Sequence, residues 1–157
     1  MSTIAINAQL GLLAALNCYS NNHFTIELTE LPAADAIEDS LKSVFGSGMN
    51  YQTKKSYSAE DWHLRVDPKG ADVKGALAAV IREWVFAMGE FPSKYSKREY
   101  VKDNVVSLVC EELEKTVGLC QVFEVFVSPP CWYEAHWRDF AFKGSEKSWL
   151  LHFGVTD

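Results

Sequence analysis

Alternating stretches of apolar and polar residues divide the first third of the chain into predicted helices and a strand. Residues 5–17 are almost entirely apolar, and we expect a short helix that is buried on most of its sides. Its leucines are Leu10, Leu12, Leu13 and Leu16. Residues 23–29 alternate apolar and polar side chains, which predicts a strand with one buried face. A second helix is expected to begin at Pro32, because proline suits the first helical position, and to end at Gly46.

The next segment is polar and then alternates again. Residues 48–58 predict either an exposed edge strand or a mobile loop. Trp62, Leu64 and Val66 alternate with polar residues, so we expect a short strand before a turn at residues 68–70.

Two long amphipathic helices are predicted in the centre of the chain. Asp72 is a favourable N-cap for the first, which ends before Gly89, and the second begins near Ser96 or Lys97 and ends at Gly118. Their apolar stripes are Leu77, Val80, Ile81, Trp84, Val85 and Met88 in the first helix, and Val106, Val109, Cys110, Leu113 and Val117 in the second. Two such stripes need a common surface against which to pack.

The C-terminal residues supply that surface as three predicted strands. Residues 119–127 are apolar on both faces and predict an interior strand. Residues 132–142 and 149–155 predict two further strands, joined by a turn at residues 143–147. Successive strands with short connections pair antiparallel. We therefore expect a single α+β domain over residues 1–157. Its antiparallel sheet contains this three-strand meander and one or two N-terminal strands, with about four helices packed on one face.

The amino-acid composition agrees with one globular domain and also bears on where in the cell the protein is found. The chain has 157 residues, of which 48% are hydrophobic and 13% aromatic, which is too apolar for a disordered protein. Its apolar stretches are shorter than the roughly 18 residues of a membrane span, and no Lys or Arg precedes the first of them. We therefore expect a cytoplasmic protein that does not bind membranes.

The cysteines and the absence of local motifs predict no cofactor or metal. Cys18, Cys110, Cys120 and Cys131 include no C-x-x-C pair, so we expect free thiols, with Cys131 as the candidate for reactivity. No glycine-rich phosphate loop, zinc-protease motif, nucleophile elbow or calcium loop occurs. The net charge of −6 disfavours direct binding to nucleic acid and favours attraction to a basic protein partner.

Residues capable of forming a site are densest in the last predicted hairpin. If Phe142 pairs with Ser148, Arg138 lies opposite His152, and a polar strip forms on one sheet face. That strip consists of Glu134, His136, Arg138 and His152, opposite a core face of Trp137, Trp149, Leu151 and Phe153. A shift by one residue brings Asp139 beside His152 instead. We favour the first register, because it separates polar from apolar residues better.

Three interpretations of this strip are open. It is the solvent side of a sheet, a protein-binding surface, or a catalytic histidine with an acidic partner, Glu134 or Asp139. Arginine and aromatic residues are frequent interface anchors, and Trp132, Tyr133 and Arg138 lie close together in sequence.

The segments 132–142 and 149–155 together resemble the closing hairpin of small bacterial immunity proteins, which inhibit the toxins of contact-dependent growth inhibition and related polymorphic toxin systems. The resemblance implies a non-enzymatic protein that binds and neutralises a cognate toxin domain, such as a nuclease. Acidic groups that we expect to contribute to binding are Asp35, Asp39, Glu111 and Glu114. The alternatives are a small enzyme that uses His136 or His152, and a phage or regulatory protein that blocks another partner.

Overall fold

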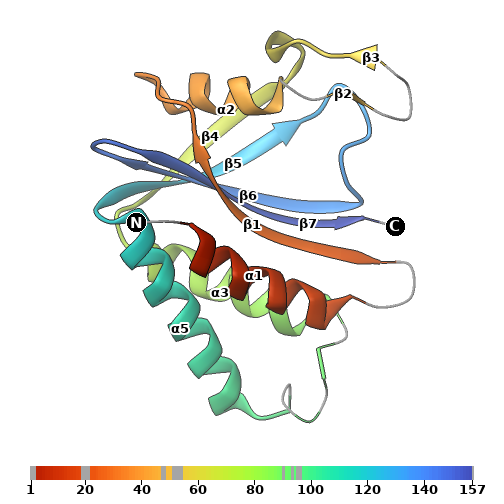
Figure 1. Cartoon of the computed structure of the whole chain (residues 1–157), viewed down its shortest axis with the longest axis vertical. Coiled ribbons are helices and arrows are strands. Elements are labelled where there is room, and N and C mark those ends of the chain that lie inside the picture. The colour runs from red at the N-terminus through yellow and green to blue at the C-terminus, as the bar shows by residue number, and fades with distance from the viewer. Residues whose placement is uncertain are drawn as a thin grey trace.

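The computed structural model describes residues 3–18, 22–46, 49–50, 55–89, 91–92, 94 and 97–156, with backbone alone at 49–50 and 55–56. Within these residues the main sheet has five antiparallel strands in the order β1-β7-β6-β5-β4 (Figure 1). These strands are β1 (His23–Leu31), β4 (His63–Gly70), β5 (Cys120–Ser128), β6 (His136–Gly144) and β7 (Ser148–Thr156). The helices are α1 (Ile4–Asn17), α2 (Ile37–Phe45), α3 (Val73–Phe86) and α5 (Glu99–Val117), with a short 3₁₀ helix η1 (Ala59–Asp61). The predicted α+β class is confirmed.

Helices cover both faces of the sheet, whereas the sequence predicted helices on one face. Helices α1, α3 and α5 lie on the face that we call the helix face, and α2 lies on the opposite face, the α2 face (Figure 1). Each face carries its own apolar cluster. Leu28, Phe140 and Leu151 belong to the helix-face cluster, whereas Ala141 and Leu150 belong to the α2-face cluster. Neighbouring residues of β6 and β7 are therefore buried on opposite sides.

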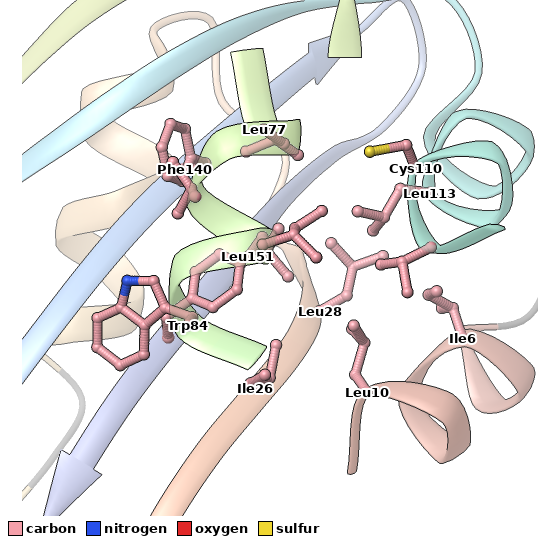
Figure 2. Packing of buried hydrophobic residues seen from close by; sticks show 14 of the residues in the cluster. Ile6, Leu10, Ile26, Leu28, Leu77, Trp84, Cys110, Leu113, Phe140 and Leu151 are labelled. Atoms are coloured by element: carbon pink, nitrogen blue, oxygen red, sulfur yellow. The ribbon is translucent and has the colours of Figure 1, made fainter. Parts of the chain in front are cut away.

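The helix-face core is formed by the predicted apolar stripes of α3 and α5. Leu77 of α3 and Leu113 of α5 are fully buried together with Phe140 of β6 (Figure 2). All five apolar residues predicted for the second long helix are buried. Full burial of one such side chain contributes roughly 1.5–3 kcal/mol, so this cluster is a main source of stability.

Helix α1 is buried on one face only, so the prediction of burial on most sides is wrong. Ile6, Leu10 and Ala14 are buried, but Leu12 is 62% exposed and Leu16 is 37% exposed. The helix packs beside the edge strand β1, where one side of it contacts the sheet and the other helices. The apolar residues on its outer side therefore have no sheet to cover them.

The second helix begins later than predicted, because the preceding strand is longer. β1 continues to Leu31, which is buried and pairs with Ser148, so Pro32 follows a strand and α2 starts at Ile37. The helix ends before Gly46, as expected.

Two further segments, residues 48–58 and 68–70, were predicted only in part. Residues 49–50 and 55–56 form a short antiparallel pair, β2 (Met49–Asn50) with β3 (Lys55–Ser56), and the residues between them lie outside the described part. Residues 68–70, predicted as a turn, continue β4 through an irregularity between Pro68 and Gly70.

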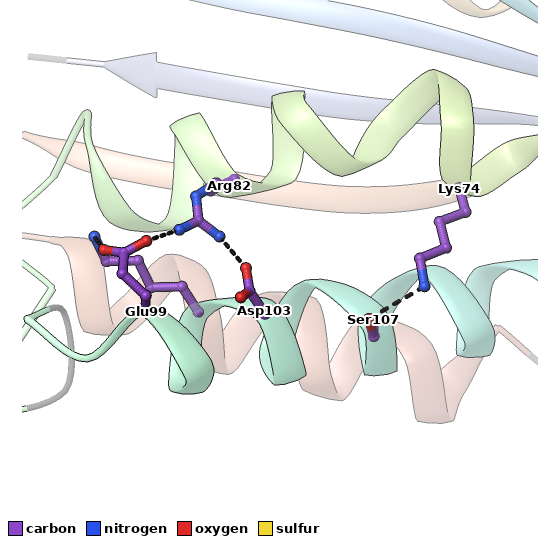
Figure 3. A network of polar contacts seen from close by, with 6 residues as sticks. Lys74, Arg82, Glu99, Asp103 and Ser107 are labelled. Carbon is purple, nitrogen blue, oxygen red and sulfur yellow. Dashed lines mark hydrogen bonds and ion pairs between the residues drawn. The ribbon is translucent and has the colours of Figure 1, made fainter.

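Polar side chains connect α3 to α5 on the outside of the molecule (Figure 3). Arg82 of α3 contacts Glu99 and also Asp103, the latter at 2.6 Å, and Lys74 donates to the Ser107 hydroxyl at 3.3 Å. Because these groups are largely exposed, each pair contributes little stability, on the order of 0–1 kcal/mol. Their common effect is to align the two helices along their length.

Candidate functional site

The register of the last hairpin differs by one residue from the favoured prediction. Asp139 pairs with His152 and Arg138 pairs with Phe153, which is the alternative register that the sequence allowed. Arg138 therefore lies on the helix face with Phe140, and His152 lies on the α2 face with Asp139. The predicted strip of four polar residues on one face does not form. The physical reason is that both faces are covered, so the register with the cleanest polar–apolar separation has no advantage.

His152 instead forms the centre of a buried polar cluster on the α2 face. Its Nδ1 lies 2.7 Å from Asp139 Oδ1 and its Nε2 lies 3.1 Å from Glu134 Oε1. The Tyr133 hydroxyl lies 3.4 Å from the same Nδ1. Asp139 is completely buried, and the side chains of His152 and Glu134 are only 15% and 13% exposed. We call these four residues the His152 cluster.

The electrostatics of the cluster favour a charged imidazole. Burial lowers the pKa of His152, but the hydrogen bonds and charges of Asp139 and Glu134 outweigh it and raise the pKa to about 9. Burial raises the pKa of the Tyr133 hydroxyl, and the two carboxylates act in the same direction. Burial also raises the pKa of Asp139, against the opposing contact with His152. At neutral pH both ring nitrogens of His152 carry protons directed at carboxylates.

The cluster attaches the segment before β6 to the sheet. Glu134 reaches His152 from that segment, and the Ala135 amide donates to the Val155 carbonyl at 2.9 Å. Gly154 is required beneath this contact, because a Cβ there would lie 1.8 Å from Glu134 Oε2. Among the described residues, Glu134 Oε2 and Asp139 Oδ2 are buried without a hydrogen-bond partner. The arrangement is thus an ion-pair clamp in which neither ring nitrogen is free to accept a proton.

Tyr133 packs into an aromatic group that closes one side of the clamp. Its ring makes edge contacts with Trp62, Phe45 and Trp137, at centroid distances of 5.6, 6.0 and 5.4 Å. Tyr133, Glu134 and His152, all predicted to contact a partner, are therefore largely internal.

The other predicted hairpin residues point outward. Trp132 is 52% exposed, His136 is exposed, and the Arg138 side chain is 38% exposed. Arg138 is held by Glu124 through contacts of 2.8 Å and 3.0 Å and lies 3.8 Å from Glu83 of α3. Because several contacts fix its guanidinium, this arginine is presented in a defined position.

Glu124 anchors a second cation as well. Lys69 Nζ lies 2.6 Å from Glu124 Oε2. Burial raises the pKa of Glu124, but the hydrogen bonds and charges of Lys69 and Arg138 outweigh it and hold the pKa below its usual value. A cavity of about 300 Å³ lies beside them, where the first turns of α3 meet the sheet. It is lined by Lys69, Asp72, Gly75, Ala76, Glu124, Arg138 and Phe140.

Two residues that the sequence analysis did not select extend this surface. The Arg65 guanidinium lies 4.2 Å from the ring centroid of Phe126, its neighbour across β4 and β5. Phe126 is 40% exposed although it belongs to an interior strand, so the helices leave this part of the helix face uncovered. We call Arg65, Phe126, His136 and Arg138 the open sheet end. The sequence held a signal for the neighbouring cations Lys69 and Arg138, which is the lone Glu124 inside an apolar strand, because a buried carboxylate needs cationic partners.

The predicted acidic residues lie on two different faces of the sheet. Asp35 just before α2 and Asp39 in its first turn are exposed, and Glu111 and Glu114 are exposed on α5. These two helices lie on opposite faces of the sheet (Figure 1). A partner bound to one pair therefore does not reach the other on the same face.

The described part of the chain was searched for exposed thiols, for groups that could bind a metal ion and for membrane-spanning helices. All four cysteines are free, with Cys18 exposed and Cys131, the candidate for reactivity, half-buried. Burial raises the pKa of the Cys110 thiol to about 11, which makes it unreactive. Among the described residues, no three His, Cys, Asp or Glu side chains are arranged to hold a metal ion, and none of the helices has the length and apolar character needed to cross a membrane.

The whole chain was compared with known protein families, curated sequences and solved structures. No protein-family model, no curated protein sequence and no solved structure matches it.

Proposed function

We propose that this protein is a non-enzymatic, protein-binding inhibitor, an immunity protein that neutralises a cognate toxin domain. The observation that carries the proposal is the open sheet end, where two arginines and an aromatic ring are exposed in fixed positions on a rigid sheet. Arginine and aromatic side chains dominate the binding energy of protein interfaces. Residues that are already fixed lose little conformational entropy on binding. His136, the fourth member of this surface, is exposed at the start of β6.

The charges suit capture of a toxin with mixed or basic surface charge. The chain has a net charge of −6, which accelerates encounter with a basic protein such as a nuclease. At the open sheet end itself, Asp67 and Glu83 lie beside the arginines, at 3.3 Å from Arg65 and 3.8 Å from Arg138. A partner surface that offers both carboxylates and basic groups matches this pattern.

The test is co-expression with the toxin encoded by the neighbouring gene, followed by measurement of affinity with the purified proteins. Reversal of charge at Arg138 is a poor variant, because it would place a carboxylate against the buried Glu124. We therefore use Arg138→Gln and Arg65→Ala. Each is expected to weaken binding by about 2 kcal/mol, or roughly thirtyfold in Kd.

The matched control is Lys115→Gln on α5. Lys115 is also an exposed cation in an ion pair, with Glu112 at 2.6 Å, but it lies away from the open sheet end. Its replacement should leave both growth protection and Kd unchanged. Absence of protection by the unaltered protein, or equal affinity of all three variants, would refute the proposal.

A small enzyme is the second candidate, because His152 does contact both acids that were considered as its partners. Proton transfer would require a carboxylate to leave one ring nitrogen. The discriminating variant is His152→Gln, examined where it is folded. An inhibitor retains growth protection after this change, whereas a histidine-dependent enzyme loses it completely.

A further inference from the structure

Helix α1 caps part of one sheet edge with side chains. Asn7 Nδ2 donates to the Leu28 carbonyl at 2.9 Å, and Asn7 Oδ1 accepts from the Leu28 amide at 2.8 Å. The carboxamide thus binds Leu28 as the backbone of a neighbouring strand would. Farther along the same strand, Cys18 Sγ accepts from the Phe24 amide at 3.3 Å. Strand β1 forms this edge of the sheet.

The residue between these two caps has no partner at the edge. In an antiparallel ladder the N–H and C=O groups of alternate residues point to the same side of a strand. Since Phe24 and Leu28 direct theirs toward α1, Ile26 does so as well, while its side chain points into the core (Figure 2). Within the described residues, no hydrogen bond uses the Phe24 carbonyl, the Ile26 amide or the Ile26 carbonyl on this side.

A cavity of about 410 Å³ opens at this position between α1 and β1. It is lined by Asn7, Gly11, Ala14, Ala15, Cys18, Phe24, Thr25, Ile26 and Glu27, and we call it the α1–β1 groove. A Cβ added to Gly11 would meet no atom within 4 Å, so the space above this helix is open. Of the described residues in this lining, Glu27 alone is charged.

We propose that the α1–β1 groove binds an extended, uncharged peptide segment of a partner protein, which adds to β1 as a short strand. Along β1 the open groups follow the order acceptor, donor, acceptor, and the backbone of an extended peptide can pair with all three. Two peptide amides donate to the Phe24 and Ile26 carbonyls, and one peptide carbonyl accepts from the Ile26 amide. Asn7 and Cys18 stay in place at the two ends of the segment.

This site is separate from the open sheet end. The groove lies on β1, whereas the open sheet end is built on β4, β5 and β6, with β7 between them in the sheet. The inference therefore does not depend on the proposed function. Loss of binding here and loss of toxin neutralisation are measured with different variants.

The experiment measures amide hydrogen exchange by NMR on the full chain. In the free protein, the Ile26 amide should exchange at least about tenfold faster than that of Leu28, which Asn7 protects. The probe is a capped hexapeptide of alternating threonine and valine at millimolar concentration. It should slow exchange at Ile26 by about tenfold and leave Leu28 unchanged. The same peptide with methylated backbone nitrogens lacks donors and should have no effect.

The blocking variant is Gly11→Leu, which places a large side chain in the lining of the groove at a position where its Cβ meets no atom within 4 Å. It should abolish the response to the peptide. Leu108→Ala, at a leucine that is 59% exposed on α5, is the control that should keep it. The proposal is overturned if Ile26 is as protected as Leu28 in the free protein. It is also overturned if the hexapeptide leaves Ile26 exchange unchanged, or if the methylated peptide or the Gly11→Leu protein gives the same slowing.

Discussion

A positive charge buried between two carboxylates is the most demanding feature at the scale of single residues. His152 donates to both Asp139 and Glu134 only while it is protonated, because a neutral imidazole has a single N–H donor. Loss of that proton would leave one buried acid without its donor and both acids without a positive charge beside them, which is costly in an interior. The clamp therefore ties the stability of the fold to pH.

We predict that stability falls as the pH rises from about 6.5 to 9. The folded-state pKa of His152, about 9, is above its ordinary value of 6.5, so its contribution is complete below pH 6.5 and disappears as the pH passes 9. This shift corresponds to about 3 kcal/mol. Urea unfolding across this range is the measurement. His152→Gln should remove most of the slope, and His136→Gln, at an exposed histidine, should keep it.

Gly154 and Gly11 should respond in opposite ways to alanine. At Gly154 the new methyl group would collide with Glu134 Oε2 and lie 2.5 Å from His152 Nε2, so the clamp must open. We expect a loss of about 3 kcal/mol, as for a broken buried ion pair. At Gly11, an open position inside a helix, alanine should add about 0.5–1 kcal/mol. Thermal unfolding of both variants tests this, and equal effects would contradict the structure.

At the scale of elements, the helices differ in whether a side chain accepts hydrogen bonds from the free backbone amides of the first turn. The Asp72 side chain accepts from the Gly75 amide at 2.9 Å and caps α3, whereas Thr3 makes no capping bond at the start of α1. The start of α3 also forms one wall of the cavity beside Arg138. This cap therefore fixes a helix that borders the proposed binding surface.

Removal of the α3 cap should cost stability while the equivalent change in α1 should not. Asp72→Ala is expected to destabilise the protein by about 1 kcal/mol, because the Gly75 amide loses its acceptor. Thr3→Ala should change stability by less than about 0.5 kcal/mol. Chemical denaturation of the two variants provides the comparison. A cost at Thr3 that equals the cost at Asp72 would show that capping is not the cause.

The elements that were predicted well are those with one buried side. β1 alternates between exposed and buried residues as its sequence does, and the stripe of α5 is buried at every expected position. The sequence of α1 carries no comparable signal, since its apolar residues are spread around the helix although only one side meets the core. Uniformly apolar sequence does not reveal which side faces a neighbour.

At the scale of the whole molecule, covering both sheet faces explains why the candidate site could be predicted only in part. Predicting a strand's register from alternating polar and apolar residues assumes that one face of the sheet is exposed to solvent. Here Phe140 is buried on the helix face and Ala141 is buried on the α2 face. Register then depends on contacts between distant segments, such as Glu134 with His152. The hairpin is rich in polar groups, as its sequence shows. Its division into an internal clamp and an external surface required the three-dimensional arrangement.

The position of β7 has a consequence for the order in which the molecule assembles. β7 lies between β1 and β6, and its pairing with β1 joins residues as far apart as His23 and Thr156. During synthesis β1 emerges early, yet its partner is translated more than a hundred residues later. Until then, Phe24 and Ile26 lack the strand beside which they are buried. Contacts between such distant residues slow folding, so the nascent chain must keep this apolar strand from associating with other chains until β7 arrives.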